Sequence, residues 1–453
     1  MSKNVRILLI APIKDISRRT VNIIRFPMIS LLCIAAVTPH KHEISIVEEE
    51  TDTLDFNADC DLVGITCMTA TAPRAYAIAA EFRKRGKTVV LGGIHPTALP
   101  HEAKSHCDCV VTGEAEPVWG KLIEDFENGC LREFYSGGTA ENLNEYPLPR
   151  RDLIKPNMLM GYEPIVTSRG CPYSCEFCSV WKFYGKRIRH VCVDRVREDI
   201  QNSKSSRFMF LDDNIVGDPE YAKSLFLVLK DMKIKWLGQA SISFAKNEEL
   251  LKLAHESGCK ALFFGVESVS EEKIKRMGKS MKTQEGTIDA IKRIMGHGLL
   301  FHASLVFGFD DDDVSVFDET LEFLYKTKIP SATFNILTPY PGTDIYNQLK
   351  AQNRLITEDW KLYDHCSVVY HPNRMTIDEL YDGYQYVKST FYSFRRIFDR
   401  FPANIRTPLA FSIANVGIKR SLREDKKTGR ENLYQLHSII ERQARANIGC
   451  LLT

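Results

Sequence analysis

The sequence predicts an α/β protein: a doubly wound parallel sheet, then a partial (β/α)6 TIM-like barrel, then a helical C-terminal region. Short apolar runs typical of buried strands alternate with helical patterns in two separate series along the chain. The segment ENLNEYPLPRRDL between the two series has proline and charge but no periodicity, as is typical of a linker. With 453 residues, the chain is long enough for two or three domains.

The first series occupies residues 1–140. VRILLIAP, EISIVEEE, DLVGITCM, TVVLGG and CDCVVTGE are predicted strands, and helices are expected at MISLLCIAAVTP, from Pro73 to Arg85 and around Trp119 to Phe126. Strands that alternate with helices favour a parallel sheet with helices on both faces. Ligands of such sheets bind at the carboxyl ends of the strands.

Small and polar residues stand at the carboxyl ends of three predicted strands. They are Thr66, Cys67, Met68, Gly92, Gly93, Gly113 and Glu114. Glycine lets a ligand approach the backbone closely, although a glycine pair is also an ordinary turn former. We therefore expect a ligand site at this edge of the sheet, and we expect the neighbouring His95 to be a loop or packing residue rather than a ligand.

A linker at residues 141–160 leads into the second series, at residues 161–350. The predicted strands are EPIVTS, RFMFLDDN, KWLGQAS, ALFFGVES, FHASLVFGF and ATFNILTP, with helical patterns between most of them. Six such units predict a partial barrel, whose chemistry belongs at the carboxyl ends of its strands. Residues 351–453 are predicted to form a helical C-terminal domain.

The composition is typical of a soluble globular protein, with 44% hydrophobic residues, 26% charged residues and a net charge of +2. Residues 391–453 hold 12 Lys and Arg against 5 Asp and Glu, and nucleic acid is disfavoured as a partner because basic residues gather only in this tail. The 13 scattered cysteines and the absence of a secretory leader pattern favour a reducing cytoplasm. The longest apolar run, of 14 residues, is too short to span a membrane.

The tail contains FYSFRRIFDRF, in which aromatic and basic residues interleave. This pattern fits either a helix that lies on an anionic membrane surface or a helix that packs against the barrel with its charges in solvent. We therefore expect a cytoplasmic protein, with peripheral contact to a membrane as one option.

Three cysteines stand close together in RGCPYSCEFCSV, with the spacing C-x3-C-x2-C: Cys171, Cys175 and Cys178. They follow the first predicted barrel strand, where a catalytic group is expected. Thiolates bind zinc and iron–sulfur clusters, but a structural zinc ion would need a fourth ligand that the neighbouring sequence does not supply. A cluster of four irons held by three thiolates would leave one iron open. A catalytic zinc on three cysteines and three unrelated buried cysteines are the alternatives.

The motif, its position and the aromatic Phe177 before the last cysteine resemble the radical S-adenosylmethionine superfamily. The resemblance implies a [4Fe–4S] cluster on the three cysteines, whose fourth iron chelates the amino and carboxylate groups of S-adenosylmethionine. It also implies that one electron cleaves the sulfonium and yields a 5′-deoxyadenosyl radical, which takes a hydrogen from an unactivated carbon. An electron donor such as flavodoxin or ferredoxin is then an expected partner.

The same resemblance assigns S-adenosylmethionine contacts to six residues: Phe177, Asp212, Asp213, Asn214, Glu267 and Gly308. The Asp-Asp-Asn sequence would lie near the methionine amine, since carboxylates pair with ammonium groups. Glu267 would hydrogen-bond the ribose, and Gly308 would form a turn near the adenine. Taken singly, each is equally consistent with a helix cap or a surface turn.

In the first series, the small-residue strand end, the double glycine and TGEAE together resemble the cobalamin-binding Rossmann-like domain. In that domain the nucleotide tail of the cofactor lies between sheet and helix, so the resemblance implies cobalamin contacts from the seven strand-end residues named above. Domains that ligate cobalt carry Asp-x-His-x-x-Gly after the first strand, but here the sequence from Asp15 to Thr20 reads DISRRT. Cobalamin is therefore expected without a histidine lower ligand, and loss of the cofactor with retention of the domain is the alternative.

Together the two domains resemble the cobalamin-binding radical enzymes of the class B methylase type, whose members include hopanoid methylases and the anaerobic Mg-protoporphyrin monomethyl ester cyclase. The resemblance implies methyl transfer to an unactivated carbon of a small hydrophobic or lipid-like substrate. Radical cyclisation or carbon–carbon bond formation without methyl transfer is the alternative reaction. A non-catalytic cobalamin or iron–sulfur sensor is the alternative from another class.

No further catalytic residue is assigned from the sequence. The remaining ten cysteines are not expected to bind the cluster: Cys33, Cys60, Cys67, Cys107, Cys109, Cys130, Cys192, Cys259, Cys366 and Cys450.

Overall fold

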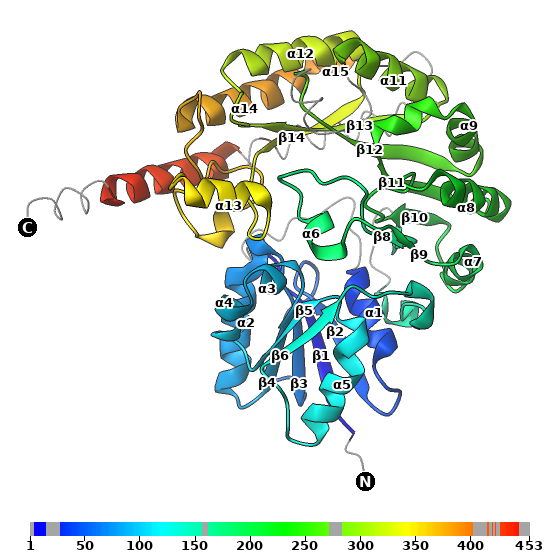
Figure 1. The fold of residues 1–453 in the computed structure, drawn as a ribbon, viewed down its shortest axis with the longest axis vertical. Helices are drawn as coiled ribbons and strands as arrows, with labels where there is room; N and C mark the ends of the chain where they lie inside the picture. Colours follow the sequence, from blue (N-terminus) through cyan, green and yellow to red (C-terminus); the bar gives the residue numbers. More distant parts are fainter. Residues whose placement is uncertain are drawn as a thin grey trace, which may run out of the picture. The chain divides into compact units, whose positions relative to one another are not determined.

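The computed structural model describes residues 4–14, 28–155, 162–270, 283–401 and 426–443, together with positions 415, 419 and 422 (Figure 1). Its contacts divide the chain into two units. The first unit comprises residues 1–174, 178–239 and 256–259, and the second comprises residues 175–177, 240–255 and 260–453. The domain limits near residues 140, 160 and 350 remain predictions.

Six parallel strands form the first sheet, in the order β2-β1-β3-β4-β5-β6. Their bounds are β1 Arg6–Ala11, β2 Glu43–Glu48, β3 Leu62–Thr66, β4 Thr88–Gly92, β5 Cys109–Gly113 and β6 Phe134–Gly138. The helices are α1 Ile29–Val37, α2 Ala72–Lys84, α3 Ile94–Ala98, α4 Pro100–Lys104 and α5 Glu116–Glu127. In Figure 1, α2, α3 and α4 lie on one side of this sheet, and α1 and α5 lie on the other.

The core of the first sheet follows from its apolar strands. Leu9, Leu62 and Val90 are almost completely buried, and they pack with α1 and α5 in one hydrophobic cluster. Burial of an apolar side chain of this size stabilises a fold by about 1.5–3 kcal/mol. The predicted doubly wound sheet is therefore confirmed, but the sequence analysis missed β6, a short strand that ends in two glycines.

A second parallel sheet has the order β14-β13-β12-β11-β10-β7. The bounds are β7 Glu163–Ile165, β10 Arg207–Phe210, β11 Lys235–Ala240, β12 Cys259–Glu267, β13 Leu300–Phe307 and β14 Ser331–Ile336. The helices of this region are α7 Val193–Gln201, α8 Pro219–Met232, α9 Glu248–Glu256, α11 Gln284–Gly296, α12 Ser315–Thr327 and α13 Asp344–Ala351. All six predicted barrel strands are present in the predicted order, as expected for a partial barrel.

The cysteine motif lies between two short strands that the sequence analysis did not foresee. β8 (Ser168–Arg169) and β9 (Arg189–His190) pair as an antiparallel two-stranded sheet. The segment between them contains the cysteines and the short helix α6 (Val180–Tyr184). The motif therefore occupies a loop whose two ends are tied together.

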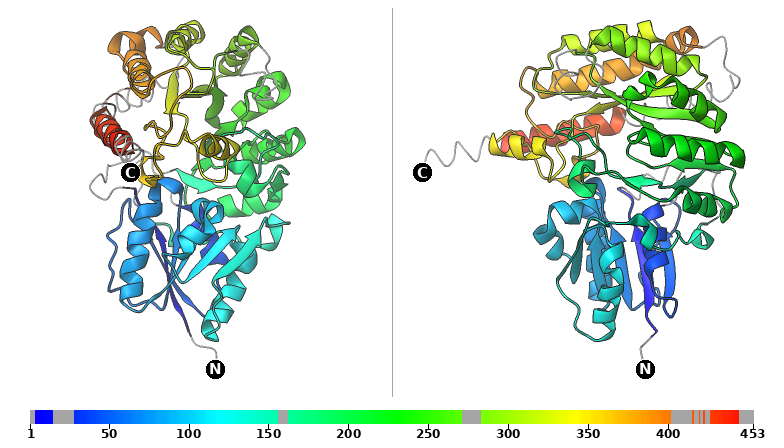
Figure 2. Two further views of the ribbon diagram at one scale, coloured as in Figure 1. Left: turned by 60° about the vertical axis from the view of Figure 1, so that its left-hand side comes forward. Right: turned by 45° about the vertical axis from the view of Figure 1, so that its right-hand side comes forward.

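The C-terminal region begins irregularly and becomes helical. Residues 352–373 contain η6 (Trp360–Leu362) and an isolated bridge between Leu355 and Tyr370. α14 (Ile377–Phe391), α15 (Phe394–Asp399) and a helix at residues 426–443 follow. Figure 2 shows α11, α12 and α14 side by side next to β13 and β14, in agreement with their contacts.

The aromatic-basic sequence FYSFRRIFDRF has some of its aromatic side chains buried and others exposed to solvent. Phe391 and Tyr392 are buried, whereas the α15 side chains of Phe394 and Phe398 are 68% and 81% exposed. Among the described residues, no helix combines the length and the hydropathy that crossing a membrane requires.

Candidate active site

Two features of the first unit hold the start of the cysteine loop in place. The Asp212 carboxylate, at the end of β10, accepts hydrogen bonds from the Thr167 and Ser168 hydroxyls at 2.7 and 2.6 Å and from the Thr167 N–H at 3.2 Å. Gly170 has a φ of +101°, and a Cβ there would lie 2.4 Å from the Arg187 carbonyl oxygen. Only glycine fits this close approach, so the backbone before Cys171 is fixed by both the strand pair and its residue types.

Asp212 and Asp213 differ in what they can still bind. Asp212 is completely buried, and burial raises its pKa although the Ser168 and Thr167 hydrogen bonds oppose the rise. Asp213 accepts one hydrogen bond, of 3.4 Å, from the Gly170 N–H. Burial, together with the charge of Asp212, raises the pKa of Asp213 to about 6. Asp212 therefore supports the loop. Asp213 is the carboxylate that could bind an ammonium group, because a nearby positive charge would stabilise its charged form.

The two residues that flank the loop on the strand pair form a buried charge cluster with the first sheet. The Arg169 guanidinium donates to Glu114 and to Glu116, each at 2.5 Å. Arg189 Nη2 lies 2.6 Å from the other oxygen of Glu114 in an ion pair whose angles fall outside hydrogen-bond geometry. Burial lowers the pKa of Arg169, but the Glu116 carboxylate outweighs it and raises the pKa well above its ordinary value. The guanidinium stays charged.

The three cysteine thiols are partly exposed and form no disulfide. No group of three or more His, Cys, Asp or Glu side chains in the described part of the chain converges on a single metal ion. Thiolates on a cluster of four irons each bind a different iron, so they need not meet at one point. Three soft donors within eight residues of one anchored loop fit an iron–sulfur cluster, since iron–sulfur clusters are held by cysteine thiolates.

The remaining residues predicted to contact S-adenosylmethionine have distinctive local structures. Asn214 is buried directly after Asp213 in the first unit. In the second unit, Glu267 ends β12 with a φ of +64°, next to a register shift of the strand. A non-glycine residue with positive φ is uncommon, and such strain gathers at functional sites.

Gly308 and Phe177 come near each other within the second unit. Gly308 has a φ of +100°, and its N–H donates to the buried Asp312 carboxylate at 2.8 Å. A Cβ at Gly308 would collide with the Tyr370 hydroxyl, so the turn requires glycine. The Phe177 ring packs edge-on against Phe309, with 5.8 Å between centroids. The structure therefore places two residues of the predicted set close together.

A cavity of about 700 Å³, open to solvent, lies at the carboxyl edge of the first sheet and belongs entirely to the first unit. Five of the seven predicted strand-end residues line it: Thr66, Gly92, Gly93, Gly113 and Glu114. Cys67 and Met68 do not. Cys67 is completely buried, which raises the pKa of its thiol, and Met68 is 52% exposed.

The sequence analysis missed several residues that line this cavity, notably Leu9, Gly64, Trp119, Phe183 and Tyr184. A glycine inside a strand often marks a place where another group approaches the backbone closely. Gly64 could therefore have been predicted as a cavity residue from the sequence. A Cβ at Gly64 would lie 3.0 Å from Leu9 and 3.4 Å from the Trp119 ring. Nothing in the sequence indicated Phe183 and Tyr184, since they reach the cavity only because their loop folds back to the first sheet.

His95, beside the double glycine, is completely buried in α3. Its Nε2 lies 3.0 Å from the Tyr76 hydroxyl and 3.3 Å from Glu102, and its Nδ1 lies 3.4 Å from the Thr69 hydroxyl. These contacts hold α3 against α2 and α4. The segment from Asp15 to Thr20, used above to argue against a histidine ligand, lies outside the described residues.

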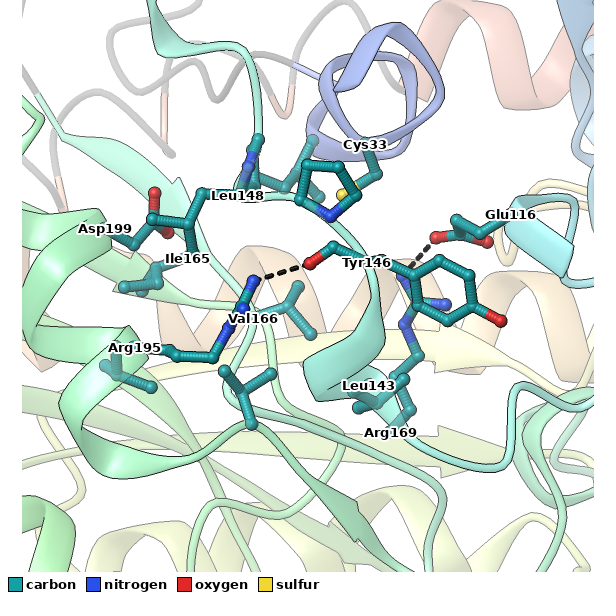
Figure 3. Close-up of a pocket in the computed structure, with 15 residues that line it drawn as sticks. Cys33, Glu116, Leu143, Tyr146, Leu148, Ile165, Val166, Arg169, Arg195 and Asp199 are labelled. Atoms are coloured by element: carbon teal, nitrogen blue, oxygen red, sulfur yellow. Dashed lines mark hydrogen bonds and ion pairs between the residues drawn. The ribbon is translucent and has the colours of Figure 1, made fainter. Parts of the chain in front are cut away.

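A second cavity of about 640 Å³, also within the first unit, lies beside the linker (Figure 3). Glu116 and Arg169 contribute to both cavities, so their ion pair forms part of each wall. Arg195 donates to the Tyr146 carbonyl oxygen at 2.5 Å, and its buried Nε has no hydrogen-bond partner in the described residues. Burial raises the pKa of the Cys33 thiol in this wall to about 12, so it stays protonated and unreactive.

The mixed polarity of the larger cavity suits an amphiphilic cofactor such as cobalamin. Its lining combines apolar side chains with the charged Glu114, Glu116 and Arg169. Leu9 and Trp119 pack so closely over Gly64 that a side chain does not fit there without displacing them.

Comparisons with known proteins identify the two domains. Residues 165–324 match the model of the radical SAM superfamily, and residues 27–122 match that of the B12 binding domain. Two curated relatives come from Chlorobaculum tepidum. Bacteriochlorophyllide d C-12(1)-methyltransferase is 30% identical over 79% of this chain and 80% of its own length, and bacteriochlorophyllide d C-8(2)-methyltransferase is 31% identical over 88% and 92%.

Hopanoid methylases and an anaerobic magnesium-protoporphyrin IX monomethyl ester cyclase are among the less similar relatives. The radical S-adenosylmethionine methyltransferase TsrM of Kitasatospora setae has the same fold, with a TM-score of 0.62 and 15% identity over 77% of this chain and 78% of that one. The predicted resemblance is confirmed: the chain belongs to the family of cobalamin-dependent radical S-adenosylmethionine methyltransferases.

Proposed function

We propose that the chain transfers a methyl group to an unactivated carbon of a small hydrophobic molecule. One observation carries the proposal: Arg169 directly precedes the cysteine loop and also lines the cavity of the first sheet. Arg169 thereby links the start of the segment suited to an iron–sulfur cluster with the cavity suited to a corrinoid.

The proposed cofactors are a [4Fe–4S] cluster, S-adenosylmethionine and cobalamin. When bound, they supply a deoxyadenosyl radical for hydrogen abstraction and a methyl group for transfer, with two S-adenosylmethionine molecules used per turnover. The thiols of Cys171, Cys175 and Cys178 hold the cluster. Asp213 neutralises the methionine ammonium, because its raised pKa means that a nearby cation stabilises its charged form.

Glu267 and Gly308 are proposed to contact the ribose and the adenine. The positive φ at Glu267 turns the strand end, and the Gly308 turn is closed by Asp312 and Tyr370. Both are positions where the backbone is held in a conformation that an ordinary loop residue rarely adopts.

The proposed substrate is hydrophobic, and bacteriochlorophyllide d is the first molecule to test, because two relatives of about 30% identity carry it in their names. A lipid substrate is the second. It is supported by the exposed Phe394 and Phe398 of α15, which lie beside Arg395 and Arg396 and form an aromatic-basic surface suited to anionic lipid.

Flotation of the full chain with anionic vesicles tests the membrane contact. The double variant Phe394→Ser/Phe398→Ser should remain in the soluble fraction if this surface binds lipid. Tyr434→Ser is the matched control, because Tyr434 is 73% exposed on a different helix. Equal flotation of all three proteins would remove the basis for a lipid surface.

We also propose that a small acidic electron carrier reduces the cluster. Lys182, Lys186 and Arg187 are exposed on the segment that follows the last cysteine of the motif. Such a basic surface steers an acidic protein toward it, with an effect that weakens as the ionic strength rises. Flavodoxin and ferredoxin are the carriers to compare.

The central experiment uses full-length protein reconstituted without oxygen with iron, sulfide and hydroxocobalamin. Four irons, bound corrinoid, 5′-deoxyadenosine and S-adenosylhomocysteine, with methylated bacteriochlorophyllide or methylated lipid, would establish the proposal. Deoxyadenosine and product without S-adenosylhomocysteine would favour cyclisation, the reaction of the cyclase relatives. Bound cofactors without deoxyadenosine would favour a sensor, and zinc without iron would overturn the cluster assignment.

A further inference from the structure

The cavity beside the linker shares only Glu116 and Arg169 with the larger cavity, so most of its lining is its own (Figure 3). α1, η3 (Leu143–Glu145), the linker, β7 and α7 all contribute to it. Apolar side chains dominate the lining: Ile29, Leu143, Leu148, Ile165, Val166, Val191 and Val196, together with two prolines. Small-molecule sites are typically cavities with an apolar lining and a few polar groups.

Two carboxylates line this cavity, and each already has a guanidinium as its partner. Asp199 accepts hydrogen bonds from Arg151 Nε and Nη2 at 2.6 and 2.7 Å. Glu116 accepts a hydrogen bond from Arg169 at 2.5 Å. Since each of these charges is balanced within the protein, the two ion pairs have little left to offer a ligand.

Arg195 of α7 is different, because most of its donors are unused. A guanidinium has five N–H donors. Arg195 Nη2 donates to the Tyr146 carbonyl oxygen at 2.5 Å, and Figure 3 shows the side chain reaching toward this residue of the linker. Within the described part of the chain, neither its buried Nε nor its Nη1 has a hydrogen-bond partner. A cation that is partly removed from water in this way favours an acceptor beside it.

The chemistry of the lining favours an acid with a hydrocarbon body over water. A water molecule accepts a hydrogen bond, but it gains nothing from contact with Val166, Val191 or Val196. A branched aliphatic acid meets both needs, because its carboxylate accepts from the guanidinium and its hydrocarbon leaves water for the apolar walls. Hydrogen bonds between a guanidinium and a carboxylate are also roughly twice as strong as those between neutral groups.

We propose that this cavity is a binding site for a short, branched aliphatic carboxylate, held by Arg195 and by the apolar walls around Val166 and Val196. The cavity is small, so a compact chain suits it better than a long one. Neither the cysteine motif nor the seven strand-end residues of the first sheet line it, so the site does not depend on the cofactors proposed for them. Because Tyr146 and Leu148 form part of the wall, a bound acid would also hold the linker against α7.

The test titrates the full-length protein with 3-methylbutanoate and follows the heat of binding. The neutral 3-methylbutanamide is the matched ligand, since it has the same shape without the charge. The acid should bind with a dissociation constant of about 1 mM or tighter, and the amide should bind at least about 10-fold more weakly. No binding of the acid, or equal binding of the amide, would overturn the proposal.

Hydroxocobalamin in excess should leave the acid bound, because the two cavities have different linings. Displacement of the acid by the corrinoid would place it in the larger cavity and would also overturn the proposal.

Three variants locate the site. Arg195→Met removes the guanidinium at similar length and should weaken the acid by about 10-fold or more. Arg197→Met is the matched control, because Arg197 lies on the same helix, pairs with Asp194 and does not line the cavity. It should leave the dissociation constant unchanged.

Val166→Phe fills the cavity without changing its charge, so it should abolish binding of the acid. The thermal midpoint of unfolding, measured on the same samples, shows that each variant is folded. Equal affinity for the acid in the parent and Arg195→Met would show that the guanidinium does not hold it. Undiminished binding in a folded Val166→Phe protein would place the acid elsewhere.

Discussion

The cavity of the first sheet takes its shape from residues that the fold itself buries, whereas the cysteine loop is fixed at its ends and partly exposed in its middle. Leu9, Val90 and Trp119 at the cavity are at most 3% exposed. At the loop, Asp212, Arg169 and Arg189 hold the two ends, and all three thiols are partly exposed. The corrinoid site is therefore expected to be preformed, and the cluster is expected to complete its own loop.

The largest expected effect comes from the cysteines. Cys171→Ala, Cys175→Ala or Cys178→Ala should abolish cluster binding and deoxyadenosine formation, because thiolates supply the ligands. Iron analysis and corrinoid binding are measured on the same samples. Corrinoid binding should persist, since no thiol lines the cavity and most of its lining comes from the first sheet, α1 and α5.

Cys130→Ala is the matched control, because Cys130 is exposed and lies outside the motif. Full turnover in any one variant of the triad would contradict the cluster assignment. Loss of corrinoid binding together with iron would show that the cavity is not preformed.

The charge cluster joins the two regions, so its disruption should affect both. Arg169→Met leaves the buried Glu116 without its partner, and removing one member of a buried pair costs about 3–5 kcal/mol. The free energy of unfolding is measured in urea. Arg150→Met is the control, because it breaks an exposed ion pair with Asp152. It should lower the free energy of unfolding by less than about 1 kcal/mol. Similar losses in both variants would mean that the buried cluster contributes little.

Asp213 is expected to give the protein a pH-dependent stability. Its pKa is about 6 in the fold, above the value of the unfolded chain, so the folded state holds the proton more tightly. Stability from this group is fully present below about pH 4 and is lost as the pH rises to about 6. Asp213→Asn should therefore raise the free energy of unfolding by about 2–3 kcal/mol at pH 7.5 and leave it almost unchanged at pH 4. A gain that is independent of pH would show that the carboxylate is not responsible.

The smallest expected effects on stability and binding distinguish two adjacent glycines, Gly92 and Gly93. Gly93 has a φ of +107°, and a Cβ there would lie 2.9 Å from the Cys67 carbonyl oxygen, so Gly93→Ala should destabilise the fold by about 1–3 kcal/mol. Gly92 is on the cavity face of β4, and a Cβ there meets nothing closer than 3.8 Å. Gly92→Ala should leave thermal stability unchanged and weaken corrinoid binding severalfold. The reverse pattern would contradict the placement of the cavity.

The sequence was sufficient to predict the two parallel sheets and the cysteine loop, because apolar runs and motif spacing are local signals. β6 was missed since its two glycines give no strand pattern, and β8 and β9 are too short to show a periodicity. The support role of Asp212 depends on hydroxyls 44 and 45 positions away. Such contacts arise from tertiary packing, which one sequence does not reveal.

The buried charge cluster also bears on how this protein can be recombined with its relatives. The linker after residue 140 is a natural place to exchange one domain for another. Glu114 lies before that point, and its counter-charges Arg169 and Arg189 lie after it. A chimera joined in the linker would inherit a buried carboxylate from one parent and its arginines from the other. The two halves can therefore be exchanged freely only between parents that share all three residues.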